Sequence, residues 1–531
     1  MNMIKGLLAG SAALALMVGA AQAQTLVYCS EGSPEGFDPG LYTAGTTFDA
    51  SAHPIYNRLL EFKKGTTETE PGLAESWDVS EDGLVYTFHL REGVEFHSTD
   101  WFTPTRTLNA DDVLFSFNRQ GDADHAWHSY VTGASWEYYN SMSMPAVVSS
   151  IEKIDDMTVR FTLSRPYASF LANLAMPFAS VMSAEYADQL AEAGNMAQLN
   201  QKPVGTGPFE FVDYQQDAVI RYTSFDQYWD GDQPIENLVF AITVDPSVRK
   251  QRLLANECQV MSYPNPADIE DLQANADLQV LEQEGLNVGY LAYNTQVEPF
   301  DDVRVRQALN MAIDHQAIID VVFQGYGTVA ANPIPPTMWS YNDAIENAPR
   351  DVEKAKELLA EAGVTDLHME IWAMPVSRPY NPNARRMAEL IQADFAEIGV
   401  DAEIVSYEWG EYLERSTALD REGAVLLGWT GDNGDPDNFM AVLLGCDAVG
   451  DANRAQWCNE EFDGLIQEAK TLTDQDARAE LYEQAQVIFK MEAPWATIAH
   501  SVVFVPMRKE VQGFVQSPLG DYTFDGVSLA E

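Results

Sequence analysis

The stretch LHMEIWAMPVSRPYNPNARRMAELIQADFAEIGVDAEIVSYEW, residues 367–409, alternates between the pattern of a strand and the pattern of a helix. Apolar and polar residues alternate in 367–373, which predicts a half-buried strand, and a second strand is predicted over 400–409. Between them, 383–399 carries apolar residues at helical spacing and ends in a glycine, a common residue just after a helix. Strand, helix and strand in this order indicate a crossover between parallel strands.

The residues on either side extend the same order. DVEKAKELLAEAG (351–363) is predicted to be a helix, with Asp351 as its N-cap and Gly363 at its end. GAVLLGW (423–429) is a continuous apolar run, typical of a strand that is buried on both faces. The whole region therefore predicts an α/β fold with a mostly parallel sheet.

Charged and aromatic residues follow each of the three predicted strands. Arg378 comes after the first, Trp409 after the second, and Asp432 after the third. In open α/β sheets, ligands bind beyond the carboxyl ends of the strands. We therefore expect a basic group, an aromatic wall and an acidic group at one edge of the sheet, an arrangement that suits a ligand with charges of both signs.

Three aspartates lie close together in WTGDNGDPDNF (429–439), so a metal site is one alternative. A calcium loop of the EF-hand type needs a glutamate eleven residues after its first aspartate, and from Asp432 that position is Leu443. Asp435 and Asp437 are better interpreted as turn residues that cap a helix beginning near Pro436. A role in a turn or helix cap does not explain why Asp432 lies at the end of a predicted buried strand. For Asp432 we therefore favour a ligand-binding role.

The overall charge excludes some partners. The chain has 81 acidic and 31 basic residues among 531, and such a surface repels nucleic acid and anionic lipid. Residues 1–23 resemble a secretory signal peptide, with Lys5 before a short apolar run and a cleavage site before Gln24. No other run is long enough to span a membrane. An exported protein without stable membrane insertion is predicted.

Four cysteines in an exported protein indicate two disulfides, for which three connectivities are possible. The short separation of Cys446 and Cys458 favours a local bridge, worth about 3 kcal/mol in the loop-entropy model. Cys29 and Cys258 would then form the other bridge. A zinc site is the alternative, but no CxxC pair is present and the histidines are scattered, so no metal ligand is predicted.

Catalytic motifs of the common hydrolase, metalloprotease and nucleotide-binding families are absent from the sequence. His97 is interpreted as an ordinary, partly buried histidine rather than a general base. The many tyrosines and tryptophans among glycine- and proline-containing loops favour a wall that encloses a ligand. The sequence therefore predicts a binding protein, with no catalytic residue and no cofactor.

The chain also resembles a known family at several places. GLAESWDVSEDGLVYTFHLREGVEFH, LNADDVLFSF, GTGPF and DDVRVRQALNMAID are similar to extracellular solute-binding proteins of family 5, the peptide- and nickel-binding group that serves ABC importers. NECQVMSYPNPADI, IPPTMWSYN, AMPVSRPYNPNARRMAE, YEWGEY and GWTGDNGDPDNF resemble the narrower dipeptide-binding branch. The similarity extends over nearly the whole chain after the signal peptide.

This resemblance implies a two-lobed periplasmic binding protein fold with an additional inserted domain. Its two crossing hinge strands are expected near 285–294 and 500–507. Lobe I would comprise residues 24–60, 201–284 and 506–531, with the inserted domain at 61–200 and lobe II, which holds the ligand anchors, at 285–505. The disulfides expected from the family are Cys29–Cys258 and Cys446–Cys458.

The resemblance also implies a function. Arg378 would hold the carboxylate of a dipeptide and Asp432 its ammonium group. The full set of predicted ligand-binding residues is Arg378, Asp432, Tyr380, Trp409, Trp429, Gly431 and Ser33. We expect a monomer in the periplasm that captures dipeptides by lobe closure and delivers them to an inner-membrane permease. Alternatives are another peptide-like ligand, such as an oligopeptide, haem or aminolevulinate, and a secreted hydrolase.

Overall fold

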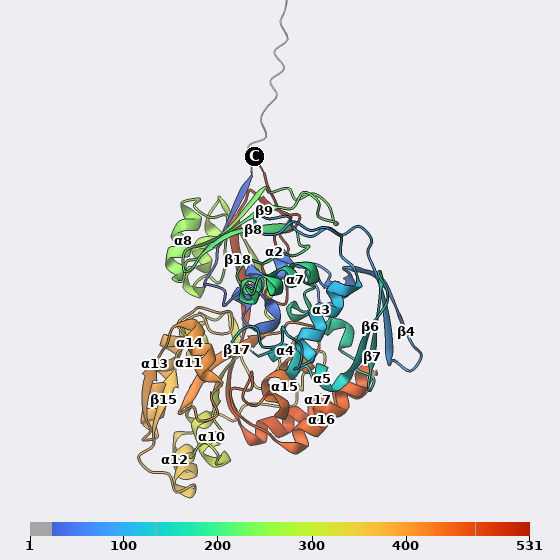
Figure 1. Ribbon diagram of the computed structural model, residues 1–531. Coiled ribbons are helices and arrows are strands. Elements are labelled where there is room, and N and C mark those ends of the chain that lie inside the picture. Colours follow the sequence, from blue (N-terminus) through green and yellow to red (C-terminus); the bar gives the residue numbers. More distant parts are fainter. Residues whose placement is uncertain (1–23, 134, 473, 531) are drawn as a thin grey trace, which may run out of the picture.

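The computed structural model describes residues 24–133, 135–472 and 474–530, so the predicted signal peptide (1–23) lies outside the described residues. One mixed sheet passes through both halves of the molecule. Figure 1 places β8, β9 and α8 at one end and β15, α12 and α13 at the other. The strands in sheet order are β16 (Asp401–Val405), β15 (His368–Trp372), β17 (Ala424–Thr430), β13 (Asn287–Tyr293), β18 (Trp495–Arg508), β11 (Val260–Met261), β1 (Thr25–Cys29), β10 (Asn237–Ala241), β9 (Val219–Ser224) and β8 (Phe209–Gln215).

Residues 351–430 fold as helices and strands in the predicted order. The Asp351 carboxylate accepts a hydrogen bond of 2.9 Å from the backbone N–H of Lys354, and α12 (Val352–Glu361) is followed by Gly363 at φ +75°. The helix α13 (Ala384–Glu397) is likewise followed by Gly399 at φ +81°. Both are left-handed conformations that glycine adopts at little cost.

Two details of the prediction were wrong. The second strand, β16, ends at Val405 and not at Trp409, because the Glu408 carboxylate accepts a hydrogen bond of 3.0 Å from Gly410 N–H and caps α14 (Trp409–Ser416). The sheet is also less parallel than expected. β15 pairs in parallel with β16 and β17, but β17 pairs antiparallel with β13, and β13 antiparallel with β18. A continuous apolar run indicates that a strand is buried on both faces. It does not indicate whether the neighbouring strands are parallel or antiparallel.

Two long strand segments connect the halves of the sheet. In β18, residues up to Ser501 pair with β13 and β14 (Gly327–Val329), and residues from Val502 onward pair with β12 (Leu278–Glu284). β12 continues into β13 through Gly285 and Leu286, so it crosses at the same place. A Cβ at Gly285 would lie 2.6 Å from the Ser501 carbonyl oxygen, so only glycine permits this close approach. These are two crossing strands between two lobes, as predicted.

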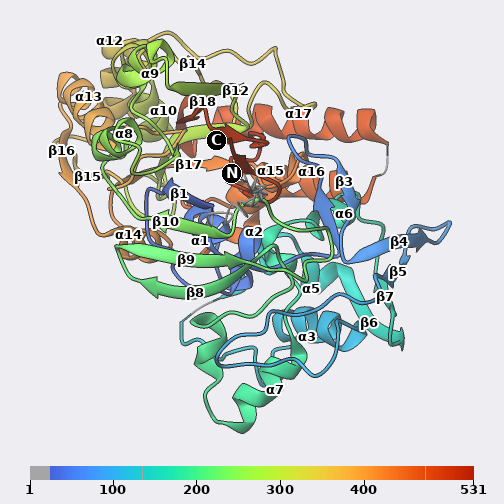
Figure 2. The ribbon, with the colours of Figure 1, turned by 90° about the horizontal axis from the view of Figure 1, so that it is seen from above.

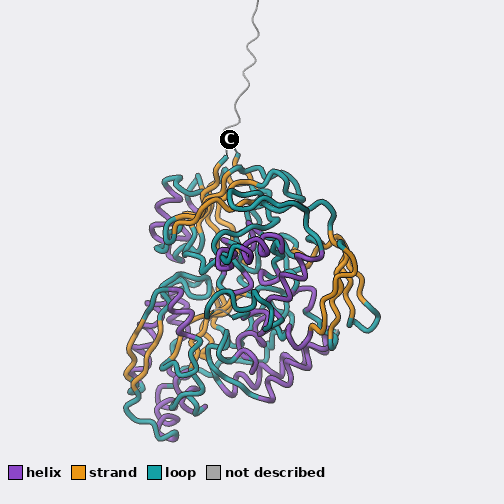
Figure 3. Tube along the Cα trace, viewed as in Figure 1, coloured by secondary structure: helices purple, strands orange, loops and turns teal. Residues whose placement is uncertain are grey.

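A second, smaller sheet stands apart from the large one, as Figures 2 and 3 show. It is antiparallel, in the order β4 (Ala74–Val79), β5 (Val85–Leu90), β7 (Thr158–Leu163) and β6 (Val148–Asp155). The helix α3 (Ala110–Gly121) packs on it, with the Phe117 and Phe161 rings in edge-to-face contact at 5.2 Å between centroids. This sheet lies within the segment predicted to be an inserted domain, and the residue limits of that domain stay a prediction.

The remaining elements surround these sheets. The structure has β2 (Leu60–Phe62) paired with β3 (Thr69–Pro71) and β19 (Val511–Gln512) paired with β20 (Ser528–Leu529). The other helices are α1 (Gly45–Ala50), α2 (Ala52–Ile55), α4 (Glu137–Ser141), α5 (Met144–Val147), α6 (Phe170–Asn173), α7 (Ala184–Glu192), α8 (Pro246–Leu254), α9 (Ile269–Ala274), α10 (Val303–Ala312), α11 (His315–Val322), α15 (Asp437–Leu444), α16 (Glu460–Thr471) and α17 (Gln475–Glu492). Within the described residues, none of the helices is both long and apolar enough to cross a membrane.

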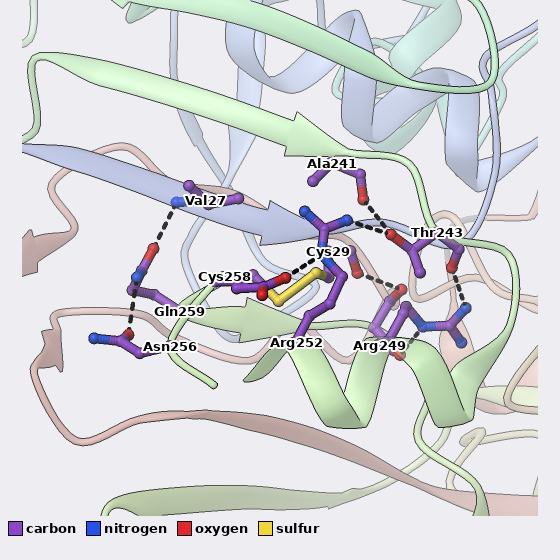
Figure 4. Close-up of a disulfide and its surroundings, with 11 residues drawn as sticks. Val27, Cys29, Ala241, Thr243, Arg249, Arg252, Asn256, Cys258 and Gln259 are labelled. Atoms are coloured by element: carbon purple, nitrogen blue, oxygen red, sulfur yellow. Dashed lines mark hydrogen bonds and ion pairs between the residues drawn. A yellow bond between two sulfur atoms is a disulfide. The ribbon is translucent and has the colours of Figure 1, made fainter. Parts of the chain in front are cut away.

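Both disulfides form in the predicted pairing. Figure 4 shows the Cys29–Cys258 bridge, which joins the end of β1 to the segment before β11 and is completely buried. Beside it, Val27 N–H donates a hydrogen bond of 2.8 Å to the Gln259 side chain. Cys446–Cys458 closes a local loop after α15. The first bridge closes a much longer loop, so it removes more conformational freedom from the unfolded chain.

Candidate ligand-binding site

A cavity of about 90 Å³ is lined by residues from both lobes. From the first lobe come Thr43 to Gly45, Phe48, Tyr263 and Leu519 to Asp521, and from the predicted inserted domain comes Tyr138. The second lobe contributes five residues of the predicted ligand-binding set: Arg378, Tyr380, Trp409, Trp429 and Asp432. The fold therefore brings most of the predicted site together at one place, beyond the carboxyl ends of β15, β16 and β17.

Arg378 lies in the loop after β15 and is 5% exposed. Its Nη1 forms an ion pair with Glu31, which follows β1 in the other lobe, so this contact joins the two lobes. Burial alone would lower the pKa of Arg378, but the Glu31 carboxylate raises it above the usual range and keeps the guanidinium charged. Its Nη2 is buried and has no hydrogen-bond partner among the described residues.

Aromatic rings surround the Arg378 guanidinium. Its central carbon lies 5.2 Å from the centre of the Trp409 ring and 5.8 Å from that of Tyr263, distances at which a cation is attracted to a ring face. Trp409 is the first residue of α14, which begins four residues after the end of β16. The cation is thus held between a strand end of one lobe and a loop of the other.

Tyr380 is positioned by two glycines. Gly289 of β13 and Gly428 of β17 are directly opposite each other in the antiparallel pair. A Cβ at Gly289 would lie 2.2 Å from the Tyr380 carbonyl oxygen, and a Cβ at Gly428 would lie 2.2 Å from Cδ2 of its ring. The two missing side chains leave the space in which Tyr380 packs against the sheet.

Asp432 is held by Asn438 of α15. The Asn438 Oδ1 accepts hydrogen bonds from Asp432 N–H at 2.8 Å and from the Trp429 ring N–H at 3.0 Å. Its Nδ2 donates to Asp432 Oδ2 at 3.1 Å, and the Tyr138 hydroxyl donates to the same oxygen at 2.5 Å. Because Tyr138 belongs to α4, far away in the sequence, this contact also bridges separate parts of the fold.

The electrostatics of Asp432 favour a cationic ligand. Burial raises the pKa of this carboxyl to about 7, the Tyr138 and Asn438 hydrogen bonds lower it, and the nearby Asp521 raises it. Within the described part of the chain, Asp432 forms no ion pair, and its side chain is partly exposed to the cavity. A positively charged group in the cavity would stabilise its ionised form.

The other two aspartates of the same loop have structural roles. Asp435 Oδ1 accepts a hydrogen bond of 3.0 Å from Asp437 N–H at the start of α15 and forms an ion pair of 2.7 Å with Arg478. Asp437 is fully buried, 3.5 Å from the Lys470 ammonium group. Both are already paired, in agreement with the interpretation of these residues as part of a turn and helix start.

Two predicted residues lie outside the cavity lining. Ser33 donates a hydrogen bond of 2.7 Å to Asp217. Gly431 donates one of 2.8 Å to the Leu286 carbonyl oxygen, and a Cβ at this position would lie 2.8 Å from the Leu286 and Phe439 side chains. Gly431 therefore serves packing beside Asp432. A ligand contact for either residue stays a prediction.

The sequence reasoning missed several residues that organise the site. Asn438 stands within the quoted WTGDNGDPDNF segment, where its amide could have been recognised as a partner for Asp432. Glu31, Tyr138 and Asp521 give no local signal. His97 is fully buried, with Nε2 2.9 Å from the Gly207 carbonyl oxygen, and burial lowers its pKa to about 4. It does not line the cavity, in agreement with its interpretation as an ordinary histidine.

A larger cavity of about 420 Å³ adjoins the first, and the two share Asp432, Leu519 and Asp521. Its lining is mostly polar and includes Arg58, Lys64 and Arg91. Most of these charges are compensated, for example in the Arg58–Glu61 and Lys64–Asp525 pairs. The Asp432 end of the ligand site therefore opens into additional polar space.

Two lobes joined by crossing strands, with a charged cavity between them, define a binding protein that encloses a small ligand. Residues 68–451, well over half of the chain, match the family described as bacterial extracellular solute-binding proteins, family 5 middle. The protein belongs to this family.

Known relatives are similar along the whole chain. The dipeptide-binding protein of Escherichia coli (strain K12) is 56% identical over 523 residues, which cover 98% of this chain and 97% of the relative. The crystal structure of a dipeptide-binding protein from Pseudoalteromonas sp. SM9913 in complex with Met-Leu has a TM-score of 0.92 and 40% identity, covering 96% of this chain and 100% of the other. A periplasmic binding protein from Helicobacter pylori in complex with the peptide STSA has a TM-score of 0.91 and 38% identity, covering 96% and 98%.

Proposed function

We propose that this protein captures dipeptides in the periplasm and delivers them to the permease of an ABC importer. One observation carries the proposal: the oppositely charged side chains of Arg378 and Asp432 line the same cavity. Asp432 forms no ion pair among the described residues, and Arg378 Nη2 has no described hydrogen-bond partner. A dipeptide has an ammonium group at one end and a carboxylate at the other, and burying both is costly unless each is paired.

Two fixed anchors also select for length. A ligand with both ends bound must match the separation of Asp432 and Arg378, whereas the side chains between them require only space and water-mediated contacts. The relatives described above, one named as a dipeptide-binding protein and one with Met-Leu bound, support this ligand class. The carboxylate would share the guanidinium with Glu31, so the two parallel hydrogen bonds usual for arginine would require Glu31 to move.

Capture would occur by closure of the lobes about the crossing strands. Residues of both lobes line the cavity, so a ligand contacts all of them only when the lobes are together. Such a ligand shifts the population toward the closed state by its greater affinity for it. The Arg378–Glu31 and Asp432–Tyr138 contacts would be made and broken with the same movement.

The proposed oligomeric state, partner chains and export route are those expected of the family. The protein would act as a monomer without catalytic activity, and the permease and the ATP-hydrolysing subunits would be separate chains. Export would use the signal peptide at residues 1–23, with cleavage before Gln24.

A longer peptide is the second candidate, because the cavity of about 420 Å³ adjoins the Asp432 end of the site. A peptide that extends into this space would leave its ammonium group away from Asp432. The H. pylori relative, whose structure contains the peptide STSA, supports this alternative.

Isothermal titration calorimetry of ligand-stripped protein with Ala, Ala-Ala and Ala-Ala-Ala tests both candidates. We expect tight one-to-one binding of Ala-Ala and much weaker binding of the other two. Equal binding of Ala-Ala-Ala would favour the longer peptide, and no binding of either peptide would refute the proposed function. Recovery of intact Ala-Ala after incubation, with no free alanine, is expected of a binding protein, whereas release of alanine would indicate a hydrolase.

A further inference from the structure

Three residues that could bind a metal ion come together beside the ligand site. They are Asp49 of α1, His53 of α2 and Asp521 of the segment between β19 and β20, and one donor atom of each lies within 4.8 Å of the others. Asp49 and His53 are four positions apart on two consecutive short helices, whereas Asp521 comes from near the end of the chain. The sequence predicted no metal ligands, because nothing local connects these residues.

His53 and Asp521 form an ion pair whose geometry is not that of a well-aligned hydrogen bond. His53 Nε2 and Asp521 Oδ1 are 3.2 Å apart, yet Nε2 is buried without a hydrogen-bond partner among the described residues. The His53 side chain is only 9% exposed, so water does not readily satisfy it. Two ligands of one zinc ion, at about 2.0–2.2 Å from the metal and at a tetrahedral angle, lie about 3.3 Å apart. The 3.2 Å spacing therefore fits two donors to a common ion as well as a direct ion pair.

Asp49 is a buried carboxylate with only the distant charge of Arg378 to offset it. It is 4% exposed and forms no ion pair with any described residue, while Glu31 adds further negative charge nearby. One oxygen, Oδ1, accepts a hydrogen bond of 2.9 Å from Tyr522 N–H, which leaves Oδ2 available. A buried anion of this kind requires a cation or a proton.

Surrounding groups orient the donors, as is usual around metal ions. The Ser517 hydroxyl donates a hydrogen bond of 3.3 Å to Asp521 Oδ2, so the opposite oxygen, Oδ1, remains directed toward His53. The nearby cation, Arg58, is paired with Glu61 and acts on Asp521 only through its charge, without an ion pair to any of the three residues. His53 and Asp521 also line the cavity of about 420 Å³, through which an ion could enter and in which a fourth ligand could bind.

We propose that Asp49, His53 and Asp521 form a binding site for one divalent transition-metal ion of the zinc type. One imidazole and two carboxylates suit Zn²⁺ or Co²⁺ better than Mg²⁺ or Ca²⁺, which prefer oxygen ligands alone. Asp521 lines the ligand cavity as well, so the metal would lie at the edge of the proposed dipeptide site. The inference does not depend on the identity of the peptide ligand.

Calorimetric titration of the chelator-treated, full-length mature protein with ZnCl₂, without peptide, tests the site. We expect one Zn²⁺ per chain. Loss of a direct ligand should weaken binding at least as much as the roughly 10- to 100-fold loss typical of outer-shell substitutions, so His53→Gln and Asp521→Asn should lose about 100-fold. His368→Gln is the matched control, because His368 forms a 2.8 Å pair with Asp401 on the surface and should bind zinc like the wild type.

The acidic surface of this protein could bind zinc weakly at many places, so stoichiometry decides the result. Weak binding of several ions, or equal affinity of His53→Gln and the wild type, would overturn the proposal. Co²⁺ bound to wild-type protein provides a second measurement that needs no variant. A four- or five-coordinate site gives strong visible absorption bands, whereas a spectrum like that of Co²⁺ in water would also overturn the proposal.

Discussion

Replacing Asp432 by asparagine should remove most of the affinity for Ala-Ala. The asparagine oxygen can still accept the hydrogen bonds from Tyr138 and Asn438 that now reach Asp432 Oδ2, so the site should keep its shape. The amide group would then face the ligand's ammonium where the wild type has a carboxylate. This substitution therefore tests charge, with little change in packing.

The magnitude follows from the burial of the ion pair. Leaving a buried charge without its partner costs about 3–5 kcal/mol, or roughly 150- to 5,000-fold in Kd. Asp432 is partly exposed to the cavity, so water can replace some of the lost interaction, and we expect the lower end of this range, about 150-fold in Kd.

The pH dependence of peptide affinity tests the charge of Asp432 more specifically than the size of the loss does. Burial raises the pKa of Asp432 to about 7 in the ligand-free protein, and in the proposed site the ammonium group would bind the ionised form. Below pH 7, wild-type affinity should therefore fall by up to about tenfold per pH unit, because each pKa unit corresponds to about 1.36 kcal/mol. In Asp432→Asn, the weak residual affinity should show no such change between pH 5.5 and 7.5.

The stability of the ligand-free protein should fall as pH rises, whereas its affinity for Ala-Ala should increase. A folded-state pKa of about 7 exceeds the ordinary value of 3.8, so the protonated carboxyl stabilises the ligand-free fold at low pH and that stability is lost as pH rises through 7. Ligand-free Asp432→Asn should consequently unfold at a higher temperature than the wild type at pH 8. Equal affinities of the two proteins for Ala-Ala, or a wild-type affinity that does not change across pH 7, would refute the assignment of Asp432 as the ammonium-binding carboxylate.

Three further substitutions test the surroundings of the site. Gly428→Ala would place a Cβ 2.2 Å from the Tyr380 ring, so we expect a loss of about 1–3 kcal/mol in unfolding free energy and weaker peptide binding, and wild-type values would contradict this packing. Glu31→Gln leaves Arg378 without its buried anion, so the ligand-free melting temperature should fall and the shift caused by Ala-Ala should grow; an unchanged shift would speak against competition between Glu31 and the ligand. Tyr138→Phe removes a hydrogen bond that lowers the pKa of Asp432, so the midpoint of the pH-dependent binding, measured by calorimetry, should move above 7; an unchanged midpoint would contradict this role of Tyr138.

The sequence was informative wherever structure depends on neighbours along the chain. The helical spacing and the flanking Asp351 and Gly363 predicted α12, because caps and left-handed glycines act within a few residues. The same reasoning failed at Trp409, since the strand pattern of β16 continues into residues that a local cap turns into a helix. The sequence pattern also did not predict strand direction, because parallel and antiparallel neighbours can bury the same apolar run.

The predicted ligand anchors could be found because each follows a strand of one region. Arg378 and Asp432 both lie beyond the carboxyl ends of neighbouring strands, where a parallel arrangement brings loops together. The family resemblance then assigned roles to them. Neither the strand pattern nor the family resemblance indicated that Gly289 and Gly428 together leave space for Tyr380. These glycines are opposite each other only because of the register between β13 and β17.

By itself, the sequence determined the α/β class, the strongly acidic charge, and the family whose fold it shares. Only the tertiary structure decided which distant residues meet. Arg378 pairs with Glu31 across 347 positions and Asp432 with Tyr138 across 294, and His53 meets Asp521 near the opposite end of the chain. These contacts depend on where two lobes and their crossing strands place each loop. Periodicity and turn chemistry act over a few residues and carry no information about such encounters.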